Sequence, residues 1–365
     1  MQITMNDVAK HAGVSIWTVS SVIHNKAKVR AETKEKVLKS IQELDYIPNE
    51  AAQNLRNKTR SVTGKKLTYN VGCIVSTIFN KYSSVFNAEI LDGMDEELTK
   101  NKYKLSFVYR CAELVNNYAM LNEMINESKI DGLILLGTTL EGIKDQIKQR
   151  IHNIVSVKFS ISSDIDSILL DQSQAAYDAI KYLIELGHKR IAFVGDLEYV
   201  PIPGPSGYNA MMDEKLVVYK QALKDFNLEY DESIVEKTLV DKEYDHVRNG
   251  YTLTKKILER ANPAFAPTAI FSAADTMTIG VLNAIREKGF KIPDDISLMG
   301  CGDDIETLRY LDPPLTTMTI NRKEIGSLAV KRIMERTKNT SVSPMKMTMP
   351  FSLAIRGSCK KIEVK

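Results

Sequence analysis

The feature that most constrains the fold of this chain is a regular alternation of short apolar runs with amphipathic stretches, which begins at residue 71. The apolar runs have the length of strands, and the stretches between them carry apolar residues at helical spacing. The run at 132–136 is continuously apolar, which is typical of a strand inside a parallel sheet. The alternation therefore predicts an α/β fold of parallel sheets flanked by helices.

The predicted elements form two successive series. Strands are expected at 71–76, 105–108, 132–136, 154–157, 168–171, 190–194, 234–238, 268–272, 297–300, 316–319 and 347–356. Helices are expected at 86–101, 115–127, 142–150, 175–186, 214–226, 247–260, 277–288 and 323–338. The first series ends at a hinge crossing predicted at 160–163, and the last part of the chain is long enough to cross again. The two series therefore predict two open parallel sheets with a cleft between them. Such a cleft is the usual place for a small ligand.

The predicted body, residues 69–365, therefore has two lobes. The N-lobe is expected at about 69–160 and 320–345, and the C-lobe at about 161–319 and 346–365.

Residues 5–25 show a different pattern, which predicts two short helices about a tight turn. Thr4 can cap the first helix, with Asp7 three residues on to answer it. Gly13 permits the reversal of the chain, and Ser15 can cap the second helix. The positions expected to face inward are Val8, Ala9, Ala12, Val14, Val19, Val22 and Ile23, and those expected on the outer side or leading end are Ile16, Trp17, Thr18 and Ser21.

Such a pair of helices is typical of a helix-turn-helix unit, whose second helix enters the DNA major groove. An ordinary helix pair that caps a domain is the alternative from this pattern alone. A third helix at 32–44 closes a three-helix unit at 1–48, with Val37, Leu38, Ile41 and Leu44 along one side. After Pro48, Asn49 can cap a short helix, which would order only against a partner because it is too short to be stable alone in water. Residues 49–68 are expected to be this hinge helix and a linker.

Charge is divided unevenly along the chain. Residues 1–66 hold twelve Lys and Arg against six Asp and Glu, a net charge of +6, and the remainder carries −3. A basic head on a mildly acidic body suggests that the head meets a polyanion, although a solvated basic face would give the same count.

Several classes of protein are disfavoured by what the sequence lacks. There is no apolar run of about 18 residues and no apolar block of a secretory signal, so we expect a cytoplasmic protein without a membrane span. The cysteines at 73, 111, 301 and 359 are not closely paired, which favours buried free thiols over a metal site or a disulfide framework. A Gly-rich phosphate loop, a nucleophile elbow and a metal-spaced His/Cys group are also missing. We therefore expect no catalytic residues, no metal and no cofactor.

Motifs spread over nearly the whole length give the chain a close resemblance to the LacI/GalR family of bacterial transcription regulators. In order they are NDVAKHAGVS with TVS, ETKEKVLKSIQELDYIPNEAAQNLR, YLIELGHKRIAFVG, PTAIFSAAD, IPDDISLMG, PPLTTM and IRGS. The resemblance implies a homodimer, or a dimer of dimers, in which each three-helix unit reads one half of a near-palindromic DNA operator. It also implies a body like that of periplasmic sugar-binding proteins, with an effector between the lobes.

The resemblance assigns roles in the DNA-binding unit. Ile16 and Trp17 occupy the positions that usually meet base edges, and an exposed Trp favours contact with a thymine methyl group or a deoxyribose. The family commonly has Arg where this chain has Ser21, so the usual preference for guanine is in doubt. Phosphate contacts, which position without specifying, are expected from Thr4, Ser15, Ser20, His24 and Asn25.

The hinge also matches the family. Leu55 stands where a leucine is wedged into the central base step and kinks the duplex. Ala52 is small enough to let two hinge helices approach each other, and Arg56 would hold the DNA backbone.

The effector positions depart from the family pattern. Ala274 replaces a common Asn while Asp275 remains, and Gly302 replaces a ligand-facing Asp next to Asp303. A clamping Arg corresponds to Lys215, which suits an anionic effector but is equally typical of a surface helix. The lost polar groups argue against a free sugar in the usual pose. The candidate effector-binding residues are Tyr82, Phe86, Asn87, Lys215, Asp275 and Asp303.

The sequence thus predicts a DNA-binding transcriptional regulator, a repressor by family resemblance, whose operator affinity is set by a small-molecule effector such as a sugar or sugar phosphate. A solute-binding protein of a transport system is the alternative; the basic head and the missing signal peptide count against it. The identity of the effector, the operator, the sign of regulation and the use of a protein corepressor stay open.

Overall fold

A computed structural model divides the chain into two compact units, residues 1–64 and 65–365. The structure describes residues 4–23, 29–44, 46, 67–76, 85–126, 128–138, 140, 142–197, 199–200, 210–211, 214–239, 245–260, 266–302, 306–339 and 341–362. In these residues, no helix has both the length and the apolar character needed to cross a bilayer.

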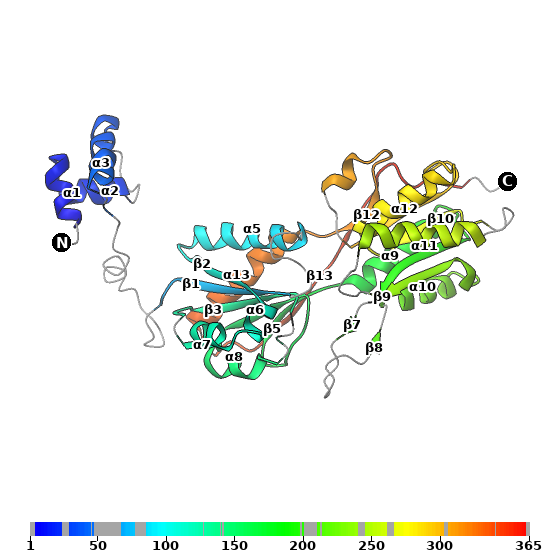
Figure 1. Cartoon of the computed structure of the whole chain (residues 1–365), viewed down its shortest axis with the longest axis horizontal. Helices are drawn as coiled ribbons and strands as arrows, with labels where there is room; N and C mark the ends of the chain where they lie inside the picture. Colours follow the sequence, from blue (N-terminus) through cyan, green and yellow to red (C-terminus); the bar gives the residue numbers. More distant parts are fainter. Residues whose placement is uncertain are drawn as a thin grey trace. The chain divides into compact units, whose positions relative to one another are not determined.

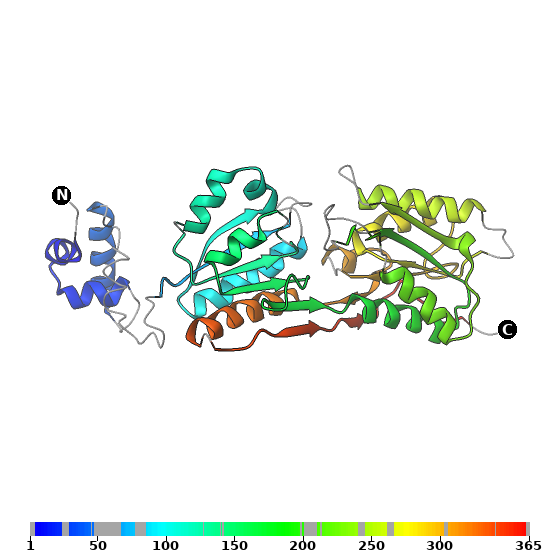
Figure 2. The ribbon, with the colours of Figure 1, turned by 90° about the horizontal axis from the view of Figure 1, so that it is seen from below.

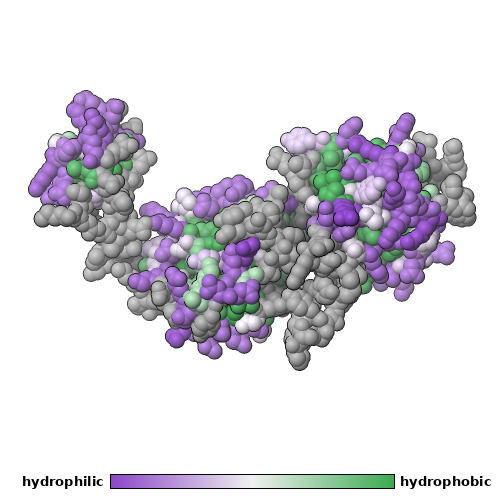
Figure 3. Space-filling view, viewed as in Figure 1, coloured by the Kyte–Doolittle hydropathy of each residue, from purple (hydrophilic) through white to green (hydrophobic). Residues whose placement is uncertain are grey.

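The first unit is built from three helices around a small core. They are α1 (Met5–Ala12), α2 (Ile16–Ile23) and α3 (Ala31–Glu43), as predicted (Figure 1). Buried residues from all three form the core: Val8, Ala9, Val19, Val22, Val37 and Tyr46. In the space-filling view, hydrophilic residues surround a hydrophobic area between the helices (Figure 3). The expectation that Leu38 faces this core was wrong, since its side chain is 48% exposed. The other three residues predicted on that side do meet the core, since Val37 is buried and Ile41 and Leu44 pack against it. Leu38 points away because neighbours on a helix are about 100° apart.

The second unit contains the two predicted sheets. The first sheet is entirely parallel and has the order β2 (Lys104–Arg110), β1 (Asn70–Val75), β3 (Gly132–Leu136), β4 (Ile154–Val157), β5 (Asp166–Leu170) and β13 (Lys346–Met349). Alternate residues along its strands face opposite layers. Cys73 and Ile134 pack towards α5 (Val85–Lys100) and α13 (Arg322–Lys338). Ile74 and Leu135 pack towards α6 (Cys111–Val115), α7 (Tyr118–Asn126) and α8 (Lys144–Arg150).

The second sheet repeats this plan. Its order is β9 (Val235–Leu239), β6 (Ile191–Leu197), β10 (Ala269–Ser272), β11 (Ser297–Cys301), β12 (Thr316–Thr319) and β14 (Ser352–Ala354). Of the described strands of this sheet, only β14 is antiparallel to its neighbour. Helices α9 (Gln172–Glu185) and α10 (Glu214–Asp225) cover one face, and α11 (His246–Arg260) and α12 (Asp275–Glu287) cover the other. Short elements complete the unit: β7 (Tyr199–Val200), β8 (Ala210–Met211), η1 (Glu232–Ile234) and η3 (Glu306–Tyr310).

The division of the chain between the two sheets differs from the prediction. Because β5 pairs with β4, the chain has not yet left the first sheet at 160–163, and residues 161–170 do not belong to the C-lobe. The single strand predicted at 347–356 is two strands, β13 in the first sheet and β14 in the second (Figure 2). Pro350, which has no N–H to donate, lies between them. The helix predicted at 115–127 is also divided, because Asn117 begins α7 anew by accepting a hydrogen bond from the Met120 amide at 3.1 Å.

The four cysteines are free, as the sequence indicated. Cys73, Cys111 and Cys301 are buried, and Cys359 is half-buried. Burial raises the pKa of the Cys73 and Cys359 thiols to about 12, so both stay protonated near neutral pH. Protonated buried thiols are poor nucleophiles and metal ligands.

Candidate DNA interface and effector site

The start of α1 is held by a reciprocal pair of hydrogen bonds. The Asp7 amide donates to Thr4 Oγ1 at 3.4 Å, and the Thr4 amide donates to Asp7 Oδ2 at 2.9 Å. The hydroxyl of Thr4 also donates to Asp7 Oδ2, and these bonds from Thr4 lower the pKa of Asp7. The predicted capping box is therefore confirmed. A phosphate contact by Thr4 stays a prediction.

The turn between α1 and α2 follows the sequence signals. Gly13 has a φ of +66°, in the left-handed region that glycine adopts at little cost, and its amide donates to carbonyls of the last turn of α1. Ser15 Oγ accepts a hydrogen bond from the Thr18 amide at 3.1 Å and lies 2.9 Å from Thr18 Oγ1. The reversal predicted at Gly13 and the cap predicted at Ser15 are thus both present, and the cap defines where the second helix begins.

The outer side of α2 carries large apolar side chains. Ile16 is 44% exposed and Trp17 is 68% exposed, while Val19 and Val22 lie in the core. The expectation that Ser21 also lies on the outer side was wrong, because its side chain is only 5% exposed. A serine side chain is too short to project past its neighbours, as the Arg common at this position in the family would.

Of the remaining predicted DNA contacts, the structure describes only Ser20. Ser20 is half-buried. The rest lie outside the described residues: His24, Asn25, Asn49, Ala52, Leu55 and Arg56.

At the carboxyl ends of β10 and β11, the structure brings together part of the predicted effector site. Lys215, in the first turn of α10, donates from Nζ to the Ala273 carbonyl oxygen at 2.5 Å. Gly302, which has a φ of +125°, lies so close that a Cβ built on it would be 3.4 Å from this Nζ. Ligands of open α/β sheets bind outside the carboxyl ends of the strands, so this edge is the suitable place for an effector.

Asp275 lies beside this group but is enclosed. Its side chain has no exposed surface, and Oδ1 accepts a hydrogen bond from Thr317 Oγ1 at 2.7 Å. A Cβ on Gly300 would be only 2.3 Å from this oxygen, so the glycine is required there. The carboxylate also lies in the first turn of α12, where the helix dipole favours negative charge. These contacts support a structural role for Asp275 and not the direct effector contact that the sequence indicated.

In the N-lobe, two predicted effector residues begin α5. Asn87 is buried, and the Phe86 ring lies 5.6 Å from the guanidinium carbon of Arg322. Tyr82 and Asp303 lie outside the described residues.

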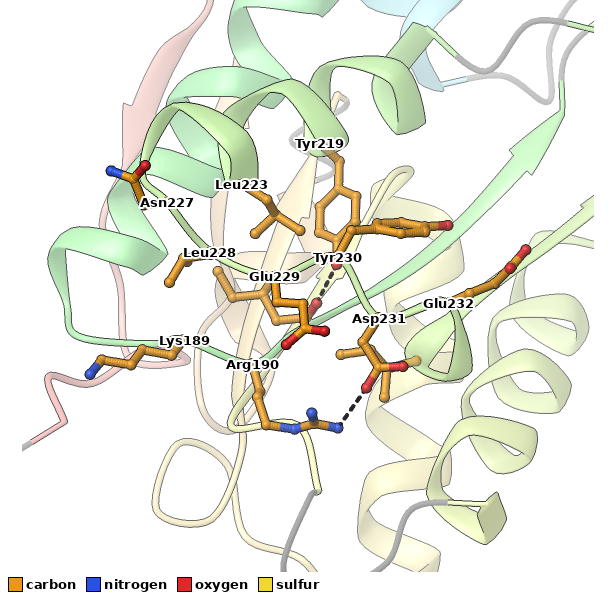
Figure 4. Close-up of a pocket in the computed structure, with 12 residues that line it drawn as sticks. Lys189, Arg190, Tyr219, Leu223, Asn227, Leu228, Glu229, Tyr230, Asp231 and Glu232 are labelled. Carbon is orange, nitrogen blue, oxygen red and sulfur yellow. Dashed lines mark hydrogen bonds and ion pairs between the residues drawn. The ribbon is translucent and has the colours of Figure 1, made fainter.

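A pocket of about 500 Å³ that was not among the predicted sites lies at the other edge of the second sheet, where β6 begins (Figure 4). The hydroxyl of Tyr219 donates to the Ile191 carbonyl oxygen at 2.7 Å, and burial raises the pKa of this tyrosine. Arg190 forms an ion pair with Asp231 at 3.0 Å. These groups bind one another, and the pocket lies at the amino ends of the strands, so it is a weaker effector candidate than the edge with Lys215.

Among the described residues, no group of three or more His, Cys, Asp or Glu side chains could hold a metal ion. Chemically, the arrangement offers a capped helix with exposed apolar side chains in a basic unit, and a lysine at the carboxyl edge of the second sheet.

Comparison with known proteins accounts for both parts. The family model "Bacterial regulatory proteins, lacI family" matches residues 4–49, and the model "Periplasmic binding protein-like domain" matches residues 180–359. The chain is 30% identical over 363 residues to the HTH-type transcriptional repressor PurR of Vibrio vulnificus (strain CMCP6), covering 98% of this chain and 99% of that protein. It is 29% identical over 362 residues to the catabolite control protein A of Priestia megaterium, covering 99% of this chain and 100% of that protein.

A solved structure supports the same fold. The crystal structure of the lac repressor dimer bound to operator and the anti-inducer ONPF aligns with a TM-score of 0.66 at 24% identity, covering 99% of this chain and 100% of that one. The matches of the N-terminal unit, the body and the full-length relatives agree. The chain belongs to the lacI family of bacterial regulatory proteins.

Proposed function

We propose that this protein is a transcriptional repressor of the cytoplasm, without catalytic activity, that binds a near-palindromic operator as a homodimer and responds to a small-molecule effector. The observation that carries the proposal is the capped helix-turn-helix unit, whose second helix exposes Ile16 and Trp17. This unit is joined to a body with two α/β sheets. The structure of the lac repressor as an operator-bound dimer supports the assembly.

The proposed mechanism uses the two parts in sequence. Helix α2 enters the major groove of each half-site, where its leading residues meet base edges. The hinge around Leu55 enters the minor groove and kinks the duplex. An effector that binds one arrangement of the body more tightly than another shifts the population between them, and the operator affinity changes by the same coupling free energy.

Lys215 supports an anionic effector, such as a sugar phosphate. Its ammonium group lies at the carboxyl edge of the second sheet, next to Gly302. The proposed role is recognition of the anionic group, by charge-assisted hydrogen bonds.

The experiment that tests DNA binding is a selection of operator sequences from a random library with the full-length protein, followed by affinity measurements on the selected site and on unrelated DNA. We expect a palindromic site and binding to it that is about a thousandfold or more tighter than to unrelated DNA. Leu55→Ala should weaken specific binding much more than non-specific binding, because the kink is made only on the operator. Equal affinity for all sequences would contradict the proposed function, and an equal loss on both kinds of DNA would contradict the role of Leu55.

The effector is sought by a thermal-shift screen of sugars, sugar phosphates and nucleosides. A phosphorylated ligand should raise the melting temperature of the wild type and not of Lys215→Met. Lys224→Met, which alters an exposed lysine of the same helix, is the matched control and should keep the response. A response that survives in Lys215→Met would rule out the lysine as the anion contact.

A further inference from the structure

The exposed surface of the recognition helix is apolar at its leading end. Trp17 has 68% of its surface exposed and Ile16 has 44%, in a unit whose other apolar side chains mostly form the core. Neither residue can be assigned to the core, because Val19 and Val22 occupy the inward positions of this helix. Exposed large apolar side chains that lie together mark an interaction surface more often than chance placement does.

The hydroxyl groups of α2 are poorly placed to read bases. Thr18 Oγ1 lies 2.9 Å from Ser15 Oγ, within the cap of the helix. Ser21 is only 5% exposed. Ser20 is half-buried and short, which suits a phosphate contact better than a reach to base edges. The hydroxyl groups of Thr18 and Ser21 are therefore directed to the cap of the helix and to its packed side.

The chemistry of the DNA surface then determines what this helix can recognise. Donors and acceptors cover most of the major groove, and its one apolar group is the C5 methyl of thymine. The net charge of +6 on residues 1–66 attracts any DNA sequence, so it supplies affinity without selection. Among the described residues of α2, the exposed pair Ile16 and Trp17 is then best placed to select bases in the major groove.

We propose that α2 selects its half-site by apolar contact of Ile16 and Trp17 with thymine methyl groups, and not by hydrogen bonds to guanine. The inference rests on the proposed function, because it concerns the specificity of the same DNA interface. The interface would recognise a pattern of thymine methyl groups, one or two in each half-site.

The test removes single methyl groups from the DNA and changes nothing else. In the selected operator, each thymine is replaced by deoxyuridine, and binding is measured with the full-length protein. Replacement at a contacted position should weaken binding about fourfold, the equivalent of one buried methylene, and about fifteenfold when both half-sites are altered. When the thymine at such a position is replaced by cytosine or by 5-methylcytosine, the protein should bind the operator with 5-methylcytosine more tightly, because that base carries the methyl group.

A double-mutant cycle assigns the effect to the helix. Trp17→Ala and Ile16→Ala should each reduce the discrimination between thymine and uracil at their own position, because the side chain that meets the methyl is gone. Leu38→Ala is the matched control, since it removes a similarly exposed apolar side chain from α3 and should leave the discrimination unchanged. The helical content by circular dichroism verifies that each variant folds.

The outcomes separate this inference from the proposed function. An operator bound tightly and selectively, with no loss at any uracil position, would overturn methyl reading and leave the repressor function intact. Full discrimination that persists in both Trp17→Ala and Ile16→Ala would also overturn it. A protein that selects no operator at all would instead refute the proposed function.

Discussion

Each sheet of the body is covered on one face by two helices that cross at glycines, and the two crossings are built alike. Between α5 and α13, a Cβ on Gly93 would lie 2.0 Å from the Lys323 carbonyl oxygen, and one on Gly326 would lie 2.1 Å from that of Ile90. Between α11 and α12, a Cβ on Gly250 would lie 2.2 Å from the Met277 carbonyl oxygen, and one on Gly280 would lie 1.8 Å from that of Val247. In both pairs the backbones touch, which no other residue would permit.

The two crossings differ in where the chain supplies their helices. Helices α11 and α12 are consecutive, whereas α5 ends at Lys100 and α13 begins at Arg322, after most of the second sheet has been made. Polar contacts join both pairs: Arg322 to Glu89 and Lys323 to Glu96, each at 2.6 Å, between α13 and α5, and Lys255 to Glu287 at 3.1 Å between α11 and α12. Closing a long loop costs more chain entropy than closing a short one. We infer that β6, β9, β10, β11 and β12 of the second sheet can form locally with their helices, before the end of the chain returns. The end of the chain then adds α13 and β13 to the first lobe and only the edge strand β14 to the second.

The largest effect on stability is expected from Asp166→Asn, because Asp166 holds the last part of the chain to the first sheet. Asp166 is buried, and its carboxylate accepts hydrogen bonds from Arg332 Nε at 2.8 Å, Arg336 Nη1 at 2.5 Å and the Met345 amide at 2.8 Å. The variant leaves two arginines beside a neutral group. The free energy of unfolding of the N-lobe, here the first lobe, which contains the first sheet, should therefore fall by about 3–5 kcal/mol.

Denaturant unfolding followed by hydrogen exchange measures this effect lobe by lobe. Amides of β3 and β4 should lose protection, and those of β10 and β11 should keep it. Glu123→Gln, an exposed change on α7, is the control and should alter neither. Equal loss of protection in both lobes would show that the lobes are not independent in the way we infer.

A smaller effect is expected from alanine at the two crossings. Gly326→Ala and Gly280→Ala should each lower the free energy of unfolding by about 1–3 kcal/mol, because a methyl group must displace backbone. Gly326→Ala should destabilise the first lobe and Gly280→Ala the second, as read from hydrogen exchange. Asn283→Ala, at an exposed position of α12, is the control for the higher helix propensity of alanine and should stabilise slightly. Stabilisation by either crossing variant would contradict the close approach.

The smallest effect, a pH dependence, is expected in the second lobe alone. His188 is buried, with Nδ1 3.0 Å from Thr268 Oγ1 and Nε2 3.2 Å from the Lys360 carbonyl oxygen, and burial lowers its pKa below the ordinary value of 6.5. Its stabilising contribution is complete above that value and is lost as the pH falls towards the folded pKa, since the unfolded chain takes up the proton first. The melting temperature of the second lobe should therefore decrease between pH 7.5 and 5.5, and less so in His188→Gln. If the melting temperature of His188→Gln fell with pH as much as that of the wild type, His188 would not be the cause of the pH dependence.

The sequence predicted most elements of this protein because their signals are local. The strands at 132–136, 154–157 and 316–319 have the predicted bounds, and the apolar runs at 132–136 and 154–157 end where those strands end. The capping box of Thr4 and Asp7 and the left-handed turn at Gly13 were also foreseen, since both depend on neighbours within a few residues. The lysine at the carboxyl edge was found through the family resemblance, and its contact with Ala273 came from the structure.

What only the tertiary structure decided depends on partners that are far away in the chain. A strand of five residues carries no signal for the sheet it joins, so the pairing of β5 with β4 became evident only in three dimensions. The same is true of Ser21 and Leu38, whose exposure is set by the packing of three helices, and of Asp275, which Thr317 and Gly300 enclose. Local chemistry thus determined which elements form and which helix we propose for DNA contact. Long-range packing determined which side chains of that helix are exposed.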